Sequence, residues 1–229
     1  MKDNLQNIKG VKSIRVILLI SLIIFVSSCT TSQTTTKNTE TSQVAIVNYL
    51  AAQQNPDLND EEKIKITIDT YFTLRYEGQK SITEQDFSSL VEDDTLDWVK
   101  KERDKREIEL YIACKFDLGY QSYKFDLDYS SIEIKKNKAE VLLMESHQVV
   151  FNAIAPQVSG MSGVSHQIAL HNKNGVWVIY QDKYKDENTQ IIASSTKEEI
   201  KKQVDENYAA NGENNLDNPE TGKCQNIIH

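Results

Sequence analysis

A carboxylate and an imidazole two residues apart are the side chains of this sequence best placed for acid–base chemistry. Glu145 and His147 fall in a segment with strand-like alternation, where residues i and i+2 share a face. A carboxylate beside an imidazole can orient it as a general base. Tyr123 and His166, from neighbouring predicted strands, could complete a polar pocket with this pair. The competing interpretation is an ordinary polar pair near a bend in the sheet.

The sequence predicts neither a metal site nor a cofactor. His166 and His171 are five residues apart in a predicted strand, so they face opposite sides and cannot bind the same ion. Asp126 and Asp128 share a strand face, but no glycine-containing calcium loop surrounds them. The sequence therefore offers isolated ligand types and no cluster of them.

No activated nucleophile is evident either. A reactive thiolate needs a nearby cation or a helix N-terminus, whereas Cys114 comes late in a predicted helix among apolar side chains. We therefore expect Cys114 to be a buried, unreactive thiol. Cys224 lies in a polar tail, so a disulfide between these two cysteines is not expected. No Gly-x-Ser-x-Gly turn is present to expose a serine.

The N-terminus has the order of features of a bacterial lipoprotein signal. Residues 1–15 carry four basic side chains and one acid. The 11 residues Val16–Val26 contain one serine and no charge, too short a run for a spanning helix, which needs about 20. The sequence Val-Ser-Ser-Cys follows at 26–29 and resembles the lipobox of bacterial lipoproteins. We expect cleavage between Ser28 and Cys29, diacylglycerol on Cys29, and a membrane-anchored protein on the extracytoplasmic face.

Cleavage would make the protein more acidic. The whole chain has 26 Lys and Arg against 34 Asp and Glu; loss of residues 1–28 removes four bases and one acid, leaving 22 against 33 and a net charge of −11. Nucleic-acid binders usually show a basic face, so a nucleic-acid partner is excluded. The same charge argues against broad electrostatic docking on anionic lipid.

A spacer is expected between the anchor and the folded domain. Residues 30–43 hold nine Ser or Thr in 14 and nothing aliphatic, too little to offset the entropy cost of ordering them. Residues 44–52 are more apolar and fit a short docked element. The expected divisions are a signal peptide over 1–28, a lipidated tether over 29–59, a folded domain over 60–187, and a helix with a polar tail over 188–229.

Amphipathic periodicity predicts a helix at each end of the folded part. Residues 61–77 carry aliphatic and aromatic side chains at helical spacing, with Arg75 on the same stripe. Asp60 is the expected N-cap and Gly78 the expected end. A last helix is expected over 196–209.

Two further helices are predicted in between. A short one over 84–91 would turn Phe87 and Leu90 inward, and a longer one would cover 94–117. The segment 100–107 in the longer helix is entirely charged with mixed signs. This pattern indicates a solvated face with i, i+4 pairs rather than a nucleic-acid patch.

The chain then changes to a period of two, which indicates antiparallel strands. The first strand alternates aromatic and charged residues; the second has apolar residues on both faces, which predicts a change of buried face and a bend. Helices followed by such strands predict an α+β fold with the helices packed on a curved sheet. The strands are expected over 123–134, 139–152, 165–172 and 176–184, with a loop over 153–163 and hairpin turns at 135–138 and Asn174–Gly175.

The order of elements resembles the cone-shaped nuclear transport factor 2-like fold. Over 61–187 the chain also resembles the module that precedes the catalytic domain in Gram-positive amidase domain-containing proteins. The amidase domain has no counterpart here, so no hydrolase activity follows from the resemblance. The segments that carry it are Tyr71–Tyr76, Glu107–Ala113, Tyr123–Tyr129, Glu145–Phe151 and Gly175–Tyr180.

Two hypotheses about function remain. The first is a non-catalytic binding or accessory module of the cell envelope, with a protein or cell-wall ligand. The second is a small-molecule binder or pocket enzyme of the isomerase or dehydratase kind, using Glu145 and His147. A truncated amidase reading frame is a third way to explain the resemblance. A filled sheet interior with an exposed apolar surface would favour the first hypothesis, and a deep cavity with converging polar groups the second.

Overall fold

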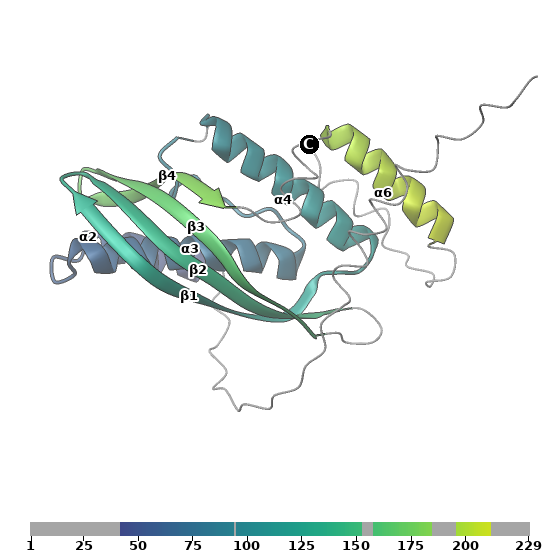
Figure 1. The fold of residues 1–229 in the computed structure, drawn as a ribbon, viewed down its shortest axis with the longest axis horizontal. Coiled ribbons are helices and arrows are strands. Elements are labelled where there is room, and N and C mark those ends of the chain that lie inside the picture. Colours follow the sequence, from purple (N-terminus) through teal and green to yellow (C-terminus); the bar gives the residue numbers. More distant parts are fainter. Residues whose placement is uncertain (1–41, 94, 153–157, 185–195, 212–229) are drawn as a thin grey trace, which may run out of the picture.

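A computed structural model describes residues 42–93, 95–152, 158–184 and 196–211 of the chain. Helices precede a four-stranded antiparallel sheet with strand order β1-β2-β3-β4, and a last helix follows it (Figure 1). The α+β prediction is confirmed. The elements are α2 (Ser42–Gln54), α3 (Asp60–Ser81), α4 (Asp97–Lys115), β1 (Tyr120–Lys135), β2 (Lys138–Phe151), β3 (Val158–Lys173), β4 (Val176–Tyr184) and α6 (Lys197–Asn211).

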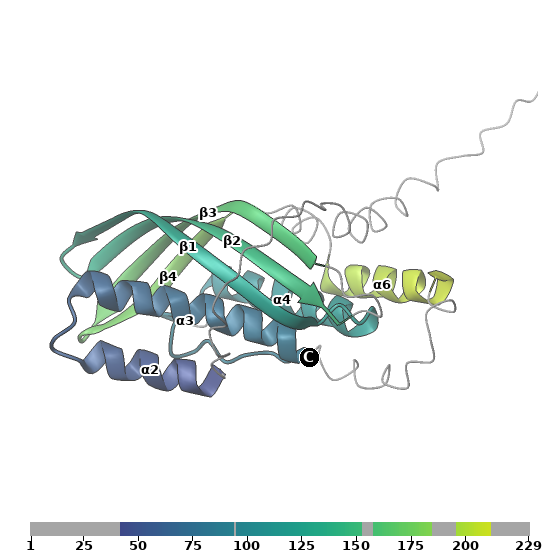
Figure 2. The ribbon, with the colours of Figure 1, turned by 90° about the horizontal axis from the view of Figure 1, so that it is seen from below.

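The helices form layers on one side of the curved sheet. Figure 2 shows α3 beneath the concave face of the sheet and α2 beneath α3. No helix in the described ranges is both long enough and apolar enough to cross a membrane. The predicted signal peptide, Ser28, Cys29, most of the predicted tether, and the tail with Cys224 lie outside the described residues.

Helix α3 begins and ends at different residues from those expected. Its N-cap is Asn59, one residue before Asp60: the Glu62 amide donates to Asn59 Oδ1 at 3.0 Å, and the Asn59 amide donates to Glu62 Oε2 at 2.8 Å. The helix runs through Gly78 to Ser81. Gly78 is buried, and a Cβ there would lie 3.2 Å from a backbone oxygen of the following turn, so this glycine permits close packing rather than ending the helix.

The predicted short helix over 84–91 is absent. Phe87 and Leu90 are buried as expected, but they lie in a turn whose backbone pairs with the edge of β4. Ile179 donates its amide to the Leu90 carbonyl at 2.7 Å and accepts from the Glu92 amide at 2.9 Å. These bonds satisfy backbone groups that a helix would have satisfied internally.

The strands keep one face toward the helices throughout. β1 alternates half-buried and exposed residues along its central part, as predicted. In β2 the odd-numbered Val141, Leu143 and Val149 are all buried, while Leu142 and Met144 remain 44% and 43% exposed. The predicted change of buried face was therefore wrong. The register shifts in all three strand pairs, and such irregularities bend a sheet without exchanging its faces.

β3 begins at Val158, so the predicted loop over 153–163 is mostly strand. Gly160 pairs with Gln148, which extends the β2–β3 ladder toward the end of the sheet. Gly163 lies at the register shift in this ladder and has a φ of +88°. Gly160 and Gly163 therefore lie in an irregular strand rather than in a loop.

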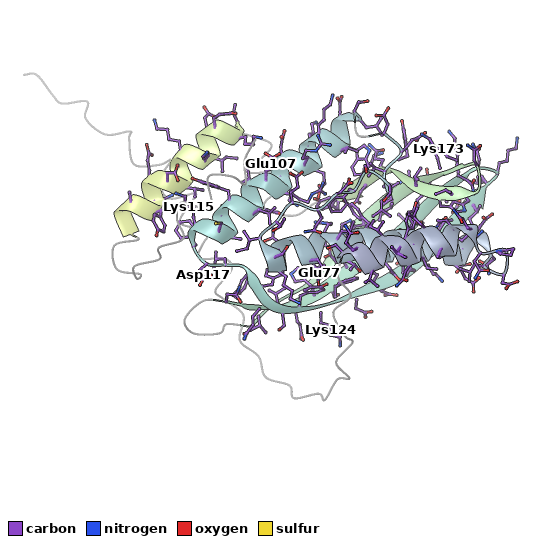
Figure 3. All side chains as sticks on the ribbon, turned by 180° about the vertical axis from the view of Figure 1, so that it is seen from behind. Glu77, Glu107, Lys115, Asp117, Lys124 and Lys173 are labelled. Carbon is purple, nitrogen blue, oxygen red and sulfur yellow. The ribbon has the colours of Figure 1, made fainter. Side chains whose placement is uncertain are left out.

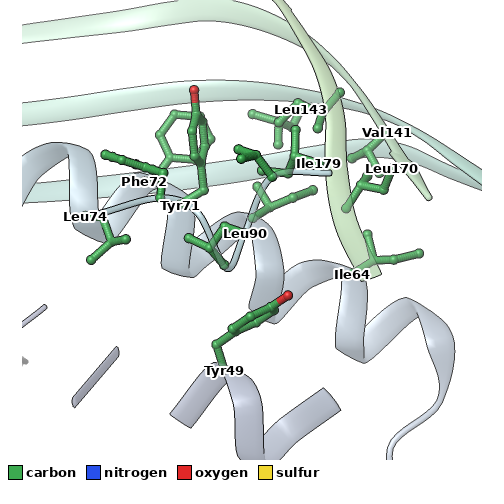
Figure 4. Packing of buried hydrophobic residues seen from close by; sticks show 14 of the residues in the cluster. Tyr49, Ile64, Tyr71, Phe72, Leu74, Leu90, Val141, Leu143, Leu170 and Ile179 are labelled. Carbon is green, nitrogen blue, oxygen red and sulfur yellow. The ribbon is translucent and has the colours of Figure 1, made fainter. Parts of the chain in front are cut away.

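The packed part of the chain includes α2 (Ser42–Gln54), which lies before the expected boundary at Asp60. Tyr49 of α2 is completely buried and points into the core (Figure 4). Its hydroxyl donates to the Trp177 carbonyl at 3.0 Å, and Gln53 Oε1 accepts from the Trp177 amide at 3.0 Å. α2 is thus the docked element expected over 44–52, and it covers part of the exposed edge of β4.

α4 and α6 share a smaller core in which Ile108 and Tyr111 pack against Ile200 and Val204. Ion pairs flank it: Lys197 lies 2.5 Å from Glu107 and Lys115 lies 3.1 Å from Asp205. Glu107 and Lys115 are labelled along α4 in Figure 3. The core and the ion pairs attach α6 to α4 rather than to the sheet.

Cys114 of α4 is disulfide-bonded and half-buried, so the expectation of a free buried thiol was wrong. The partner cysteine lies outside the described residues. The apolar residues next to Cys114 in the sequence predict that it is buried, but they do not predict that a second cysteine lies close to it.

Candidate functional site

The concave face of the sheet holds a carboxylate–imidazole–carboxylate chain made by three adjacent strands. His166 of β3 places Nε2 at 3.1 Å from Glu145 Oε2 of β2 and Nδ1 at 3.0 Å from Asp182 Oδ1 of β4. The three residues are 0%, 6% and 8% exposed, respectively. Alternation places all three on the inner face, and antiparallel pairing places their strands side by side.

This geometry favours the imidazolium form of His166. A neutral imidazole carries one N–H, but here both ring nitrogens face carboxylate oxygens. Burial disfavours the charge on His166, but the hydrogen bonds to Asp182 and Glu145 outweigh it and raise its pKa above the ordinary value. Burial likewise opposes ionisation of Glu145, yet His147, His166 and Arg75 around the carboxylate hold its pKa well below its ordinary range.

Glu145 has two further neighbours at one end of this chain. The Tyr76 hydroxyl of α3 donates a hydrogen bond to Glu145 Oε1. Nδ1 of His147 lies 3.7 Å from the same oxygen, too far for a hydrogen bond, and has no hydrogen-bond partner among the described residues. The His147 side chain is 15% exposed, so it is the most accessible member of the group.

Tyr123, the fourth predicted pocket residue, lies beside this group but bonds elsewhere. Its ring stacks on Tyr76, with centroids 5.2 Å apart. Its hydroxyl donates to Glu77 Oε1 of α3 at 2.7 Å (Glu77 is labelled in Figure 3). The structure therefore brings Glu145, His147 and His166 together and places Tyr123 next to them as part of an aromatic stack.

A second buried ionic group joins α4 to β4. Tyr184 donates its hydroxyl to Glu102 Oε2 at 2.7 Å and accepts from Lys105 Nζ at 2.7 Å. Arg75 Nε and Arg106 Nη1 lie 3.8 and 3.7 Å from Glu102 Oε1. Burial opposes ionisation of Glu102, but these cations outweigh it and lower its pKa.

Tyr184 connects the two groups. Its ring stacks on the His166 imidazole, with centroids 4.7 Å apart, and the Arg75 guanidinium lies 5.3 Å from the centre of the Tyr184 ring. A continuous set of alternating charges and aromatic rings thus crosses the interior from β2 to α4. Its role in packing is plain: it fixes α3 and α4 against the sheet.

The sequence alone does not reveal this second group, because the charged run 100–107 predicts a solvated face. In the structure Glu102, Lys105 and Glu107 are only 7%, 4% and 5% exposed, which corrects that prediction. The available signal was Arg75 on the apolar stripe of α3. A cation that faces the core requires a buried anion, and a neighbouring helix rich in acids was the place to seek it.

Five polar atoms in and around these two groups have no hydrogen-bond partner among the described residues: the Tyr71 hydroxyl, Arg75 Nη1, Glu102 Oε1, Arg106 Nε and His147 Nδ1. Tyr71 is 1% exposed, so its hydroxyl is fully desolvated. A buried polar group without a partner costs about 1–3 kcal/mol. The network therefore leaves polar atoms without partners at the α3–α4 side and at His147, whereas both ring nitrogens of His166 are hydrogen-bonded.

The arrangement offers little for catalysis. His166 already holds its proton between two carboxylates, so it cannot act as a base, and its complete burial keeps it from substrate. No group of three potential metal ligands occurs among the described residues. Within this group, His147 retains the form of a general base, because it is partly exposed and its Nδ1 has no hydrogen-bond partner among the described residues.

The comparisons with known proteins add little. No family model matches the chain, and no curated protein matches it. Among solved structures it is similar to the intermembrane space region of the chloroplast protein ARC6, with a TM-score of 0.34 and 9% sequence identity, over 56% of this chain and 98% of that one. A similarity of that size carries no argument about fold or function.

Proposed function

We propose that this protein is a lipid-anchored, extracytoplasmic module that binds a protein or cell-wall ligand without catalysing a reaction. One observation carries the non-catalytic part of the proposal. His166, the histidine with the strongest acid partners, is completely buried with both ring nitrogens bonded. Such a group braces three strands together and is unsuited to proton transfer with a substrate.

The filled interior of the sheet supports the same proposal. Ile68, Tyr71 and Phe72 of α3 pack against the concave face and are at most 1% exposed (Figure 4). Apolar side chains on the outer face, Leu142 and Met144, are by contrast more than 40% exposed. A ligand or partner is therefore expected on the outside of the fold.

The anchor rests on the sequence. The basic segment, the 11-residue apolar run and the Val-Ser-Ser-Cys ending at Cys29 support export and lipidation. With lipid on Cys29, the disulfide of Cys114 must be made with Cys224, the third cysteine of the chain, contrary to the expectation from the sequence; such a bond fits an oxidising compartment. We also propose that the sheet and its helices belong to the nuclear transport factor 2-like class, as a module of the amidase-associated kind.

Two experiments test the proposal. Cys29→Ala should release the protein from the membrane fraction or leave it as uncleaved precursor; unchanged membrane retention at mature size would refute the lipid anchor. The purified protein should hydrolyse neither amide nor ester substrates. Cosedimentation with isolated cell wall, or capture of a surface protein that survives purification, would support the binding role.

A specific observation favours a second candidate function. Nδ1 of His147 has no hydrogen-bond partner among the described residues and lies 3.7 Å from an ionised carboxylate, so a small movement would complete an acid–imidazole pair. That pair could move a proton on a small bound molecule, as in an isomerase or dehydratase. Turnover of an enolisable substrate that disappears in His147→Ala, with the melting temperature unchanged, would establish this function in place of the first.

A further inference from the structure

Helix α2 (Ser42–Gln54) presents an outward face with no charge on it. The helix contains no Asp, Glu, Lys or Arg, whereas charged residues make up 26% of the chain. Val44, Val47 and Leu50 project outward and are 45%, 62% and 42% exposed. The opposite face docks through Tyr49 and Gln53, so the outward face is fixed in place by the core.

We infer that this face of α2 rests on the surface of the lipid bilayer. The inference depends on the proposed lipid anchor at Cys29 and deepens it. Ser42 follows Cys29 by 13 residues, which span at most about 47 Å even when fully extended. In the described part of the chain, α2 is thus the element nearest in sequence to the anchor.

The charge distribution favours α2, rather than the other exposed apolar surface of the fold, as the surface that contacts lipid. Leu142 and Met144 on the outer face of the sheet pair with Ser131 and Asp128 of β1, and Glu140 lies on the same face. That face also carries Lys124 and Asp126, so it presents charged side chains that would have to be desolvated on contact with the bilayer. The α2 face adds no charge that would have to be desolvated, and aliphatic side chains at this spacing can enter the interfacial region.

α2 and the outer face of the sheet also lie on opposite sides of the molecule. Figure 2 shows α3 between them. If α2 lies on the bilayer, the sheet faces away from it and is free to meet a partner. The inference therefore assigns a membrane side and a ligand side to the fold.

The test compares two tryptophan variants of the full-length, lipidated protein in phosphatidylcholine vesicles that contain brominated acyl chains. Val47→Trp places the probe on α2, where Val47 is 62% exposed, and Leu142→Trp places the same probe on the outer sheet face, where Leu142 is 44% exposed. We expect bromine quenching of the added fluorescence to be at least threefold greater for Val47→Trp. The native Trp98 and Trp177 contribute the same background to both, and the melting temperatures should match that of the unmodified protein.

Flotation of the vesicles separates this inference from the proposed function. If both variants float but are quenched equally, the anchor holds and α2 does not contact lipid. If both float and cross-linking captures α2 of one copy against α2 of another without quenching, the face is a dimer interface and the inference fails. If neither variant floats, the lipid anchor itself is wrong and the inference falls with it.

Discussion

The Tyr76 hydroxyl of α3 donates a hydrogen bond to Glu145 Oε1 of β2, within the core and across the interface between helix and sheet. Glu145 also accepts from the imidazolium of His166, and this second bond extends the contact to β3 and, through Asp182, to β4. One tyrosine on a helix is thereby linked to three strands. Tyr71, one turn and a half earlier on the same helix, is equally buried but has no partner for its hydroxyl among the described residues.

This contrast predicts opposite effects for the same chemical change. Tyr76→Phe removes a hydrogen bond to a charged acceptor and should lower the free energy of unfolding by about 1.5–3 kcal/mol. Tyr71→Phe removes a desolvated hydroxyl without a partner among the described residues and should raise the free energy of unfolding by about 1 kcal/mol. Urea unfolding of the two variants provides the measurement. Equal losses would mean that Tyr71 has a partner or that the Tyr76–Glu145 bond is not formed.

The imidazolium between Glu145 and Asp182 predicts a pH dependence of stability. Because the pKa of His166 is raised in the folded state, its contribution is fully present below its unfolded pKa of about 6.5 and is lost as the pH rises through the folded pKa. His166→Gln keeps a polar side chain but cannot donate to both carboxylates as a cation. The difference in unfolding free energy between the unmodified protein and this variant should be largest near pH 6, about 3–5 kcal/mol, and should shrink toward pH 9.

The comparison isolates His166 because both proteins retain Arg75, His147 and Tyr184 around the site. The pKa of Glu145 is lowered, so its contribution is present above its unfolded pKa of about 4.3 and is lost as the pH falls through the folded value. Measurements from pH 5.5 upward avoid that transition. A difference that stays constant or grows with pH would show that His166 is neutral in the fold.

Much of the fold follows from local periodicity, and the site follows from it only in part. The alternation Tyr123, Phe125, Leu127 assigned β1 and its inner face, and the spacing of Glu145 and His147 placed them on one face of β2. His166 was identified as a neighbour because antiparallel strands of known order bring their inner faces together. These predictions depend only on the two-residue period of a strand and on the antiparallel direction of successive strands.

The rest depends on contacts between segments far apart in the sequence. Asp182 became part of the site because β4 pairs with β3, and Glu102 because α4 lies against Arg75. Nothing local in the charged run of α4 distinguishes a buried Lys105 from a solvated one. Gly78 is similar: it looked like a helix end, but the tight contact with the next turn that requires it is tertiary.

A third prediction tests the register of β1. Phe125 faces inward, stacked on Tyr76 with ring centroids 5.0 Å apart, while Asp126 points to solvent. Lys124, also outward, lies on the side of β1 away from α3 (Figure 3). Phe125→Ala should cost roughly 2–4 kcal/mol, less than for a fully buried ring because Phe125 is half-buried. Asp126→Ala should cost under about 0.5 kcal/mol. Equal losses in urea melts would mean that the strand is shifted by one residue.

The last prediction concerns the start of the folded domain. Tyr49 fills the space between α2, α3 and β4, and its hydroxyl donates to the carbonyls of Trp177 and Ser89 at 3.0 and 3.1 Å. Tyr49→Ala should therefore lower the free energy of unfolding by about 4 kcal/mol, from lost burial and from two backbone oxygens left without this donor.

Val47, 62% exposed on the same helix, supplies the matched control: Val47→Ala should change stability by less than about 0.5 kcal/mol. The fluorescence of Trp177, whose Nε1 donates to Asp60 Oδ1 at 2.9 Å, reports the transition from within the interface. If the edge of β4 depends on α2, Tyr49→Ala should also increase hydrogen exchange at the Trp177 amide, which bonds to Gln53. If Tyr49→Ala is as stable as Val47→Ala, α2 does not unfold together with the rest of the domain. The cooperative domain then begins at Asp60.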